Sequence, residues 1–137
     1  MNNTETFNLF VYGTLLGDSN FKHFAPEYTG HGQWTTLEGF ERRAVSHGGF
    51  PAIFPNTGHN VRGMLFKDVP SRYLSRFDSY EGCHGGPGDL YNRHKVTVPD
   101  PVTGVDVETF VYVWPKGTEG LQANDWDVDY FLGRSNS

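Results

Sequence analysis

Glycine and proline divide this chain into short apolar segments, and this division limits the possible fold more than any other feature. The 137 residues include 17 glycines and 8 prolines. Short runs of β-branched and aromatic residues between such turn-forming residues are typical of β-strands. We therefore predict strands at residues 7–12, two or three strands between residues 28 and 55, another at 61–67, and a hairpin of strands 91–98 and 107–114.

Three segments carry signals for short helices. Residues 18–25 begin at a capping candidate and end before a proline, and residues 71–80 have an apolar stripe that includes Leu74 and Phe77. Residues 124–132 are a third candidate. No strand–helix–strand unit repeats along the chain. The pattern therefore predicts an α+β fold, in which six or seven strands form a small, mostly antiparallel, curved or barrel-like sheet with two or three short helices.

The length of the chain fits one domain, which we expect to span residues 1–137, with residues 1–6 flexible. The polar N-terminus does not resemble a signal peptide, and no apolar run approaches the about 18 residues of a membrane span. The expected location is therefore the cytoplasm. The sequence does not indicate an oligomeric state.

Composition argues against several classes of function. The formal net charge is −5, with only 11 Lys and Arg residues and no basic run, so neither nucleic acid nor an anionic membrane is an expected partner. Cys83 is the single cysteine, which rules out an intrachain disulfide and a Cys-x-x-Cys zinc site. The six histidines lack metal-ligand spacing, and Asp125, Asp127 and Asp129 match a calcium loop only in part. We therefore expect no metal and no cofactor.

Glu81 is the most informative polar residue. It follows Phe77 by four positions and Leu74 by seven, which places it on the apolar stripe of the predicted helix. It also lies at the C-terminal end, where the helix dipole disfavours a negative charge. Both effects raise the pKa of a carboxylate toward the range of a general base at neutral pH. The alternative is that Glu81 forms an ion pair with Arg76, Arg93 or another nearby base.

A second candidate is the segment Tyr12, Gly13, Thr14 and Leu15, directly after the first predicted strand. A glycine at a strand end allows a sharp turn and the close approach of a ligand. The backbone N–H groups that follow it can then bind a carboxylate or an oxyanion. The segment lacks the glycine spacing of a phosphate-binding loop, and an ordinary turn remains the alternative.

Together with their surroundings, these two features resemble the gamma-glutamylcyclotransferase-like (AIG2-like) family, and the pattern is most similar to that of the gamma-glutamylamine cyclotransferases. The likeness covers nearly the whole chain in the expected order. The similar segments are Phe-Val-Tyr-Gly-Thr-Leu at 10–15, Phe-Pro-Ala-Ile at 50–53, Val-Arg-Gly-Met-Leu-Phe at 61–66, Leu-Ser-Arg-Phe-Asp-Ser-Tyr-Glu-Gly at 74–82, Tyr-Asn-Arg at 91–93, the strand at 108–113 and the closing segment at 126–132.

The resemblance implies a small α+β barrel and an enzyme, a transferase or lyase, that releases 5-oxoproline from gamma-glutamyl compounds by intramolecular aminolysis without a cofactor. It further implies that Glu81 is the catalytic acid/base. Tyr12, Gly13, Thr14 and Leu15 would bind the glutamyl head group of a small-molecule substrate. The resemblance does not identify the leaving amine.

Two departures from the family pattern keep an alternative open. Members of the family often carry Lys or Arg shortly after the first motif, where this chain has Leu16-Gly17-Asp18. The stretch at 83–90 is longer and richer in glycine than expected, and it is a candidate lid or determinant of substrate choice. A non-catalytic protein that binds a small ligand in the same pocket is therefore the second hypothesis.

Overall fold

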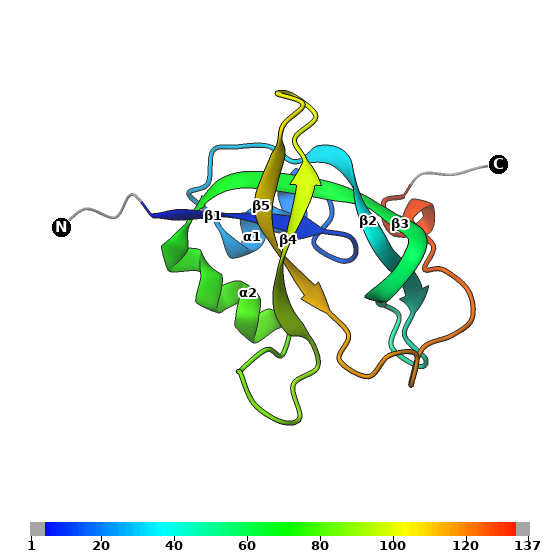
Figure 1. The fold of residues 1–137 in the computed structure, drawn as a ribbon. Coiled ribbons are helices and arrows are strands. Elements are labelled where there is room, and N and C mark those ends of the chain that lie inside the picture. Colours follow the sequence, from blue (N-terminus) through cyan, green and yellow to red (C-terminus); the bar gives the residue numbers. More distant parts are fainter. Residues whose placement is uncertain (1–4, 134–137) are drawn as a thin grey trace.

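The β-forming segments of the chain pair into one sheet of five strands, and short helices pack against it (Figure 1). The computed structural model describes residues 5–133. The strands are β1 (Thr6–Val11), β2 (Gln33–Ala44), β3 (Pro51–Pro70), β4 (Asn92–Pro99) and β5 (Asp106–Val113). The α-helices are α1 (Asp18–Phe24), α2 (Leu74–Tyr80) and α3 (Val128–Phe131), and a 3-10 turn, η1 (Ser71–Tyr73), leads into α2.

The sheet is mostly antiparallel and strongly curved. Its strand order is β2-β3-β1-β5-β4, and only β1 and β5, which meet at Leu9 and Phe110, run parallel. The two outer strands also approach each other, because Thr35 Oγ1 of β2 donates a hydrogen bond of 2.6 Å to the carbonyl of Pro99 in β4. The predicted α+β fold with a curved, barrel-like sheet is therefore confirmed.

The prediction of six or seven strands was wrong for the described residues, which form five. The segments ending at residue 55 and beginning at residue 61 belong to one long strand, β3, because both pair with β2. The register jumps between Glu38–Asn60 and Phe40–Pro55, so residues 56–59 bulge outward. Their polar side chains interrupt the apolar pattern although the strand continues.

The ends of the predicted elements also shift slightly. Of the six N-terminal residues expected to be flexible, 1–4 lie outside the described residues, whereas Thr6 pairs with Pro70 in the sheet. The predicted helix at 124–132 is reduced to the single turn α3.

Alternate residues of β1 face two separate cores. On one face, Leu9 and Val11 pack with α1 and α2, where the ring of Phe21 stacks on Phe66 with 3.7 Å between centroids. On the other face, Phe10 joins the apolar residues inside the curved sheet. This alternation is what the period of two in a strand dictates.

Helix α2 carries the apolar stripe that the sequence predicted. Phe77 is fully buried, and its ring centroid lies 4.9 Å from that of Phe21. The helix ends at Tyr80, Glu81 follows as the C-cap residue, and Gly82 with φ 66° turns the chain away. The packing of Phe77 therefore fixes the position of Glu81.

Gly63 sets the distance between β1 and β3. A Cβ atom at this position would lie 2.3 Å from the carbonyl oxygen of Val11 and 2.6 Å from Cζ of Phe10. We expect Gly63→Ala to lower the free energy of unfolding by about 2–3 kcal/mol. The matched control is Gly86→Ala, since a Cβ at Gly86 meets no atom within 4 Å. Denaturant titration would measure both, and equal midpoints would contradict the close contact.

Candidate active site

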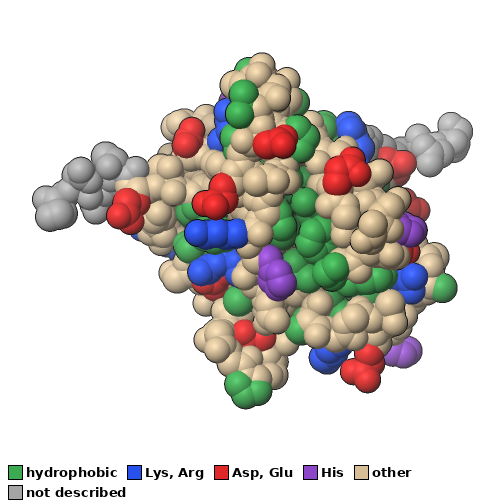
Figure 2. Space-filling model, in the orientation of Figure 1, with side chains coloured by type: hydrophobic (Ala, Val, Ile, Leu, Met, Phe, Trp, Pro, Cys, Tyr) green, Lys and Arg blue, Asp and Glu red, His purple; other side chains and the backbone are tan. Residues whose placement is uncertain are grey.

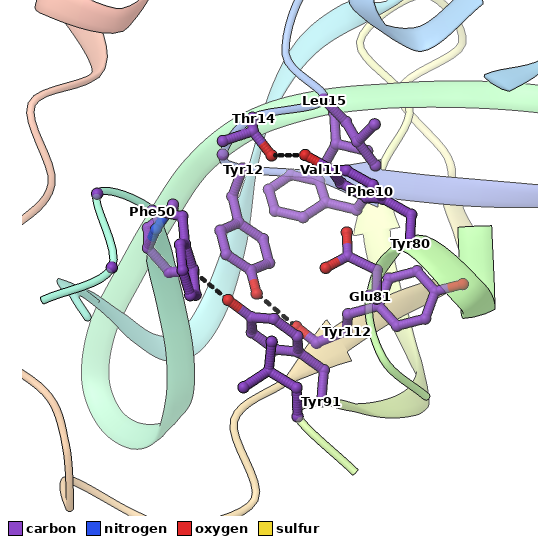
Figure 3. A pocket seen from close by; sticks show the side chains of 15 residues that line it. Phe10, Val11, Tyr12, Thr14, Leu15, Phe50, Tyr80, Glu81, Tyr91 and Tyr112 are labelled. Carbon is purple, nitrogen blue, oxygen red and sulfur yellow. Dashed lines mark hydrogen bonds between the residues drawn. The ribbon is translucent and has the colours of Figure 1, made fainter. Parts of the chain in front are cut away.

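One cavity of about 340 Å³ lies at the C-terminal end of β1 (Figure 3). Its walls come from β1 and the loop that follows it, the β2–β3 turn, the C-terminal end of α2, the segment directly before β4, and β5. The lining residues are Phe10, Val11, Tyr12, Gly13, Thr14, Leu15, Gly48, Gly49, Phe50, Pro51, Tyr80, Glu81, Leu90, Tyr91 and Tyr112. The fold thus brings all five sequence-predicted site residues, 12–15 and Glu81, to one pocket.

The carboxylate of Glu81 points into this cavity toward Tyr12 (Figure 3). Among the described residues, none gives that carboxylate a hydrogen bond or an ion pair. Burial among aromatic rings raises its pKa to about 8. An unpaired carboxylate with this pKa can both accept and return a proton near neutral pH.

The alternative that Glu81 is a structural ion pair was wrong. Arg93 instead pairs with Asp78, and its guanidinium lies 4.8 Å from the ring centroid of Phe110. Arg76 lies 5.6 Å from the ring centroid of Tyr73. The nearby bases are therefore engaged with other groups, and Glu81 has no counterion in the described part of the chain.

Four tyrosines of the pocket have their hydroxyl groups committed to other partners. Tyr12 donates to the carbonyl of Tyr112 at 2.7 Å, and Tyr91 donates to the carbonyl of Pro51 at 2.6 Å. Tyr112 itself donates to Asp78 Oδ1 at 2.6 Å, while the hydroxyls of Tyr80 and Thr14 lie 2.6 Å apart in a shared hydrogen bond. These bonds fix the rings around the cavity.

Burial, and then the neighbouring Glu81, raises the pKa of Tyr91 well above its ordinary value. Burial is also the main reason that the pKa of Tyr12 and that of Tyr112 are raised. The three phenols are therefore neutral at physiological pH, and they contribute rigid apolar walls rather than charge.

The loop after β1 is held against the β2–β3 turn. A Cβ at Gly13 would lie 2.6 Å from Cγ of Pro51, so only glycine fits. The N–H of Leu16 donates to the carbonyl of Gly13 at 2.9 Å. Within residues 5–133, the N–H groups of Thr14 and Leu15 have no acceptor, so they can bind an anionic oxygen.

Arg42 supports the loop from behind, and no sequence pattern indicated this role. Its side chain is 9% exposed, and Nη1 donates to the carbonyl of Tyr12 at 2.9 Å. Nε and Nη2 bind the carboxylate of Asp125 at 2.8 and 3.1 Å. Arg42 and Asp125 are 83 residues apart in the chain, a separation at which local patterns carry no information.

Asp18 follows the first motif, in the region where members of the family often have Lys or Arg, and its contacts are structural. Its carboxylate accepts a hydrogen bond from the N–H of Gly32 at 2.9 Å and pairs with His31 Nδ1 at 2.8 Å. It is not among the residues that line the pocket. The loop after β1 therefore supplies backbone groups and no cationic side chain to the cavity.

The glycine-rich stretch at 83–90 folds into a closed loop beside the pocket. The N–H of Leu90 donates to the carbonyl of Gly82 at 3.0 Å, and the N–H of Gly85 donates to Asp89 Oδ2 at 2.8 Å. Burial opposes ionisation of Asp89, but backbone N–H groups of residues 84–86 outweigh it and lower the pKa of this carboxyl. The loop places Leu90 in the pocket wall, while its role as a lid stays a prediction.

In residues 5–133, no group of three or more His, Cys, Asp or Glu side chains is arranged to hold a metal ion. Asp125 pairs with Arg42, and Asp127 caps α3 by accepting a hydrogen bond from the N–H of Tyr130 at 2.9 Å. Cys83 has a free thiol and lies outside the lining of the cavity. None of the helices in this part of the chain has the length and apolar character to cross a membrane.

The raised pKa of Glu81 has a measurable effect on stability. Because the pKa is about 8 in the folded chain and near 4.5 in the unfolded chain, the contribution of Glu81 to stability is fully present below about pH 4.5 and is lost as the pH rises through 8. The amide of a Glu81→Gln variant would imitate the protonated acid at every pH. We therefore expect this variant to match the wild type near pH 4 and to exceed it by about 1–3 kcal/mol near pH 9, allowing for partial solvent exposure.

Denaturant titrations of both proteins across this pH range would test the expectation. Glu38→Gln, at an exposed position of β2, is the control and should not change the pH profile. A constant difference between wild type and Glu81→Gln at all pH values would contradict a buried, unpaired carboxylate.

Comparisons with known proteins place this chain in a family. Residues 9–128 match the family described as gamma-glutamyl cyclotransferase, AIG2-like. A search among curated proteins found no match. The chain resembles a solved structure from Arabidopsis thaliana, with a TM-score of 0.74 and 21% identity over 96% of this chain and 84% of that one.

Two further solved structures have the same fold. An AIG2-like protein from Mus musculus has a TM-score of 0.68 and 24% identity, over 89% of this chain and 86% of that chain. A structure described as gamma-glutamyl cyclotransferase has a TM-score of 0.66 and 22% identity, over 80% and 67% of the two chains. Identities this low show only that the fold is shared. The match to the family covers residues 9–128, which is most of the chain. The chain therefore belongs to the AIG2-like gamma-glutamyl cyclotransferase family.

Proposed function

We propose that residues 1–137 form a single-domain, cofactor-independent cyclotransferase that releases 5-oxoproline from a gamma-glutamyl amine or a related gamma-glutamyl compound. The observation that carries the proposal is the unpaired carboxylate of Glu81, whose pKa is about 8, beside the loop of residues 12–15. Family membership supports the reaction class. The proposed role of Glu81 is that of general acid and base.

In this proposal the glutamyl head group binds between the loop and Glu81. The α-carboxylate or the developing oxyanion accepts hydrogen bonds from the N–H groups of Thr14 and Leu15, which have no acceptor within the described chain. The α-ammonium group lies beside Glu81, where its positive charge favours the ionised carboxylate. The rings of Tyr12 and Tyr91 fold the substrate so that its amine reaches its own γ-carbonyl.

The chemistry is an intramolecular aminolysis. Ionised Glu81 takes a proton from the α-ammonium, and the resulting amine attacks the γ-carbonyl carbon to form the C–N bond of a five-membered ring. The C–N bond to the leaving amine then breaks, while Glu81 returns the proton to the departing nitrogen. Ionised again, Glu81 takes the second proton from the ring nitrogen and passes it to the released amine. Two protons thus leave the α-nitrogen and two reach the leaving nitrogen, so the products are 5-oxoproline and the protonated leaving amine without net proton release.

The surface is compatible with a small-molecule partner and a cytoplasmic location, which are both part of the proposal. On the face shown in Figure 2, Lys and Arg side chains lie among Asp and Glu side chains rather than in one basic patch. The net charge of −5 disfavours attraction to nucleic acid or to anionic lipid.

Activity should depend on the ionised form of Glu81. We expect kcat/KM for 5-oxoproline release to rise with pH toward a plateau above about pH 8. Glu81→Gln should lower kcat by about 10²–10⁴-fold and remove this pH dependence, because the amide cannot accept a proton. Chromatographic measurement of 5-oxoproline from a panel of gamma-glutamyl amines, with Glu38→Gln as control, provides the test.

Full activity of Glu81→Gln would overturn the mechanism. If the wild type releases no 5-oxoproline from any compound, yet one of them raises the melting temperature, the protein is instead a non-catalytic binder that uses the same pocket.

The hydrogen bond from Arg42 to the loop after β1 should increase the affinity of the pocket for its substrate. We expect Arg42→Met to raise KM about tenfold and to change kcat less than about threefold, because it frees the carbonyl of Tyr12 and loosens the loop. Arg43→Met is the matched control, since Arg43 pairs with Glu41 on the same strand and does not line the pocket. Equal KM values for the two variants would contradict an effect of Arg42 on substrate binding.

A further inference from the structure

Two carboxylates at the C-terminal end of α2 face different cavities. Glu81 lines the pocket described above. Asp78 instead lines a separate surface hollow, together with Cys83 and Arg93. The N–H of Cys83 donates to the carbonyl of Asp78 at 2.9 Å, which keeps the chain closed around Glu81. Because both carboxylates belong to this one tight turn, a displacement of Asp78 is transmitted to Glu81.

Tyr112 connects the two cavities. Its ring lines the pocket together with Glu81, and its hydroxyl donates to Asp78 Oδ1 at 2.6 Å (Figure 3). The other carboxylate oxygen of Asp78, Oδ2, accepts a hydrogen bond from Nη1 of Arg93. Asp78 therefore ties the end of α2 to β5 through Tyr112 and to β4 through Arg93.

The ion pair of Asp78 and Arg93 is partly buried, with side chains 24% and 29% exposed. Residues three apart on a helix have Cβ atoms about 5–6 Å from each other, so an unbalanced charge at Asp78 would act on Glu81 with incomplete screening. The pair carries no net charge. In agreement, burial raises the pKa of Glu81 to about 8, and no charged group of residues 5–133 contributes to this change.

The other titratable groups near Glu81 come from every element around the pocket. The phenols of Tyr12, Tyr91 and Tyr112 have raised pKa values and stay neutral at physiological pH. Of the charged groups, Asp78 is carried by the same helix end as Glu81. The titratable side chains that line the pocket or adjoin its walls are Tyr12 after β1, Arg42 on β2, Asp78 and Tyr80 on α2, Cys83, His84 and Asp89 in the loop after α2, Tyr91 before β4, Arg93 on β4, Tyr112 on β5, and Asp125, which balances Arg42.

We infer that Asp78 and Arg93 form a positioning pair for Glu81, which holds its carboxylate in the pocket and leaves no net charge beside it. The inference rests on the proposed function in one respect, that Glu81 is the acid and base of the reaction. Neither member of the pair lines the pocket, so both act through Glu81 and not on the substrate. Removal of either member leaves the charge of the other unbalanced, and the two removals therefore have opposite effects on Glu81.

Two single substitutions should move the pKa of Glu81 in opposite directions. Asp78→Asn leaves the positive charge of Arg93, which favours the ionised carboxylate and should lower the pKa by about one pH unit at low ionic strength. Arg93→Gln leaves the negative charge of Asp78 and should raise the pKa by a similar amount. The double variant Asp78→Asn/Arg93→Gln should return it to the wild-type value.

NMR titration of labelled glutamate carboxyl carbons measures these pKa values without turnover, and the signal of Glu81 is assigned by its loss in Glu81→Gln. The midpoint of the pH profile of kcat/KM for 5-oxoproline release should move in the same direction as the pKa in each variant. Arg93→Lys keeps the charge and should keep the midpoint, even where it lowers the melting temperature. Glu41→Gln and Arg43→Gln are the matched controls, because they unbalance an ion pair on β2 that does not line the pocket.

A merely structural pair would lower the melting temperature without opposite changes in the pKa of Glu81. Changes of the same sign, or an unchanged pKa in both single variants, therefore overturn the inference and leave the cyclotransferase intact where 5-oxoproline is still released. Opposite changes without any release of 5-oxoproline support the positioning pair and overturn the catalytic proposal. If Asp78→Asn does not fold, equal pKa values of Glu81 in Arg93→Gln and Arg93→Lys overturn the inference.

Discussion

The ion pair between Asp78 and Arg93 determines the chemical state of the pocket. Asp78 lies on α2, three residues before Glu81, and it also accepts a hydrogen bond of 2.6 Å from the hydroxyl of Tyr112. These two bonds tie the end of α2 to β4 and β5. They also engage Arg93, one of the two arginines that the sequence offered as partners for Glu81. Asp78 therefore makes the structural contacts, whereas Glu81 has no partner among residues 5–133 and its pKa is raised to about 8.

Long-range polar contacts hold the other walls of the pocket. Arg42 joins β2 to the loop after β1 and to Asp125 near the C-terminus, and Trp126 joins the C-terminal segment to the β2–β3 turn. Each contact links segments that are far apart in the sequence. The positions of the loop after β1 and of the β2–β3 turn therefore depend partly on Arg42, Asp125 and Trp126, which do not line the cavity themselves.

The sequence predicted those parts of the molecule that local periodicity controls. The apolar stripe of Leu74 and Phe77 placed Glu81 at the end of a helix that faces the core, and the structure confirms that position. The number of strands was wrong because backbone pairing with β2 continues across the polar bulge at 56–59, where side-chain patterns give no signal. The partner of Arg93 was also missed, since both Asp78 and Glu81 precede it and only three-dimensional packing selects Asp78, 15 residues away, over the nearer Glu81.

The hydrogen bonds that hold the aromatic walls of the pocket also restrict which ligands the walls can bind. A tyrosine-rich pocket would ordinarily offer several hydroxyl groups to a polar ligand. Here the hydroxyls of Tyr12, Tyr91 and Tyr112 are each donated to a protein acceptor, so that the rings present mainly hydrocarbon to the cavity. Within residues 5–133, the carboxylate of Glu81 and the N–H groups of Thr14 and Leu15 then remain without a protein partner. The polar groups that the pocket leaves for a ligand are therefore set by the hydrogen bonds that stabilise the fold.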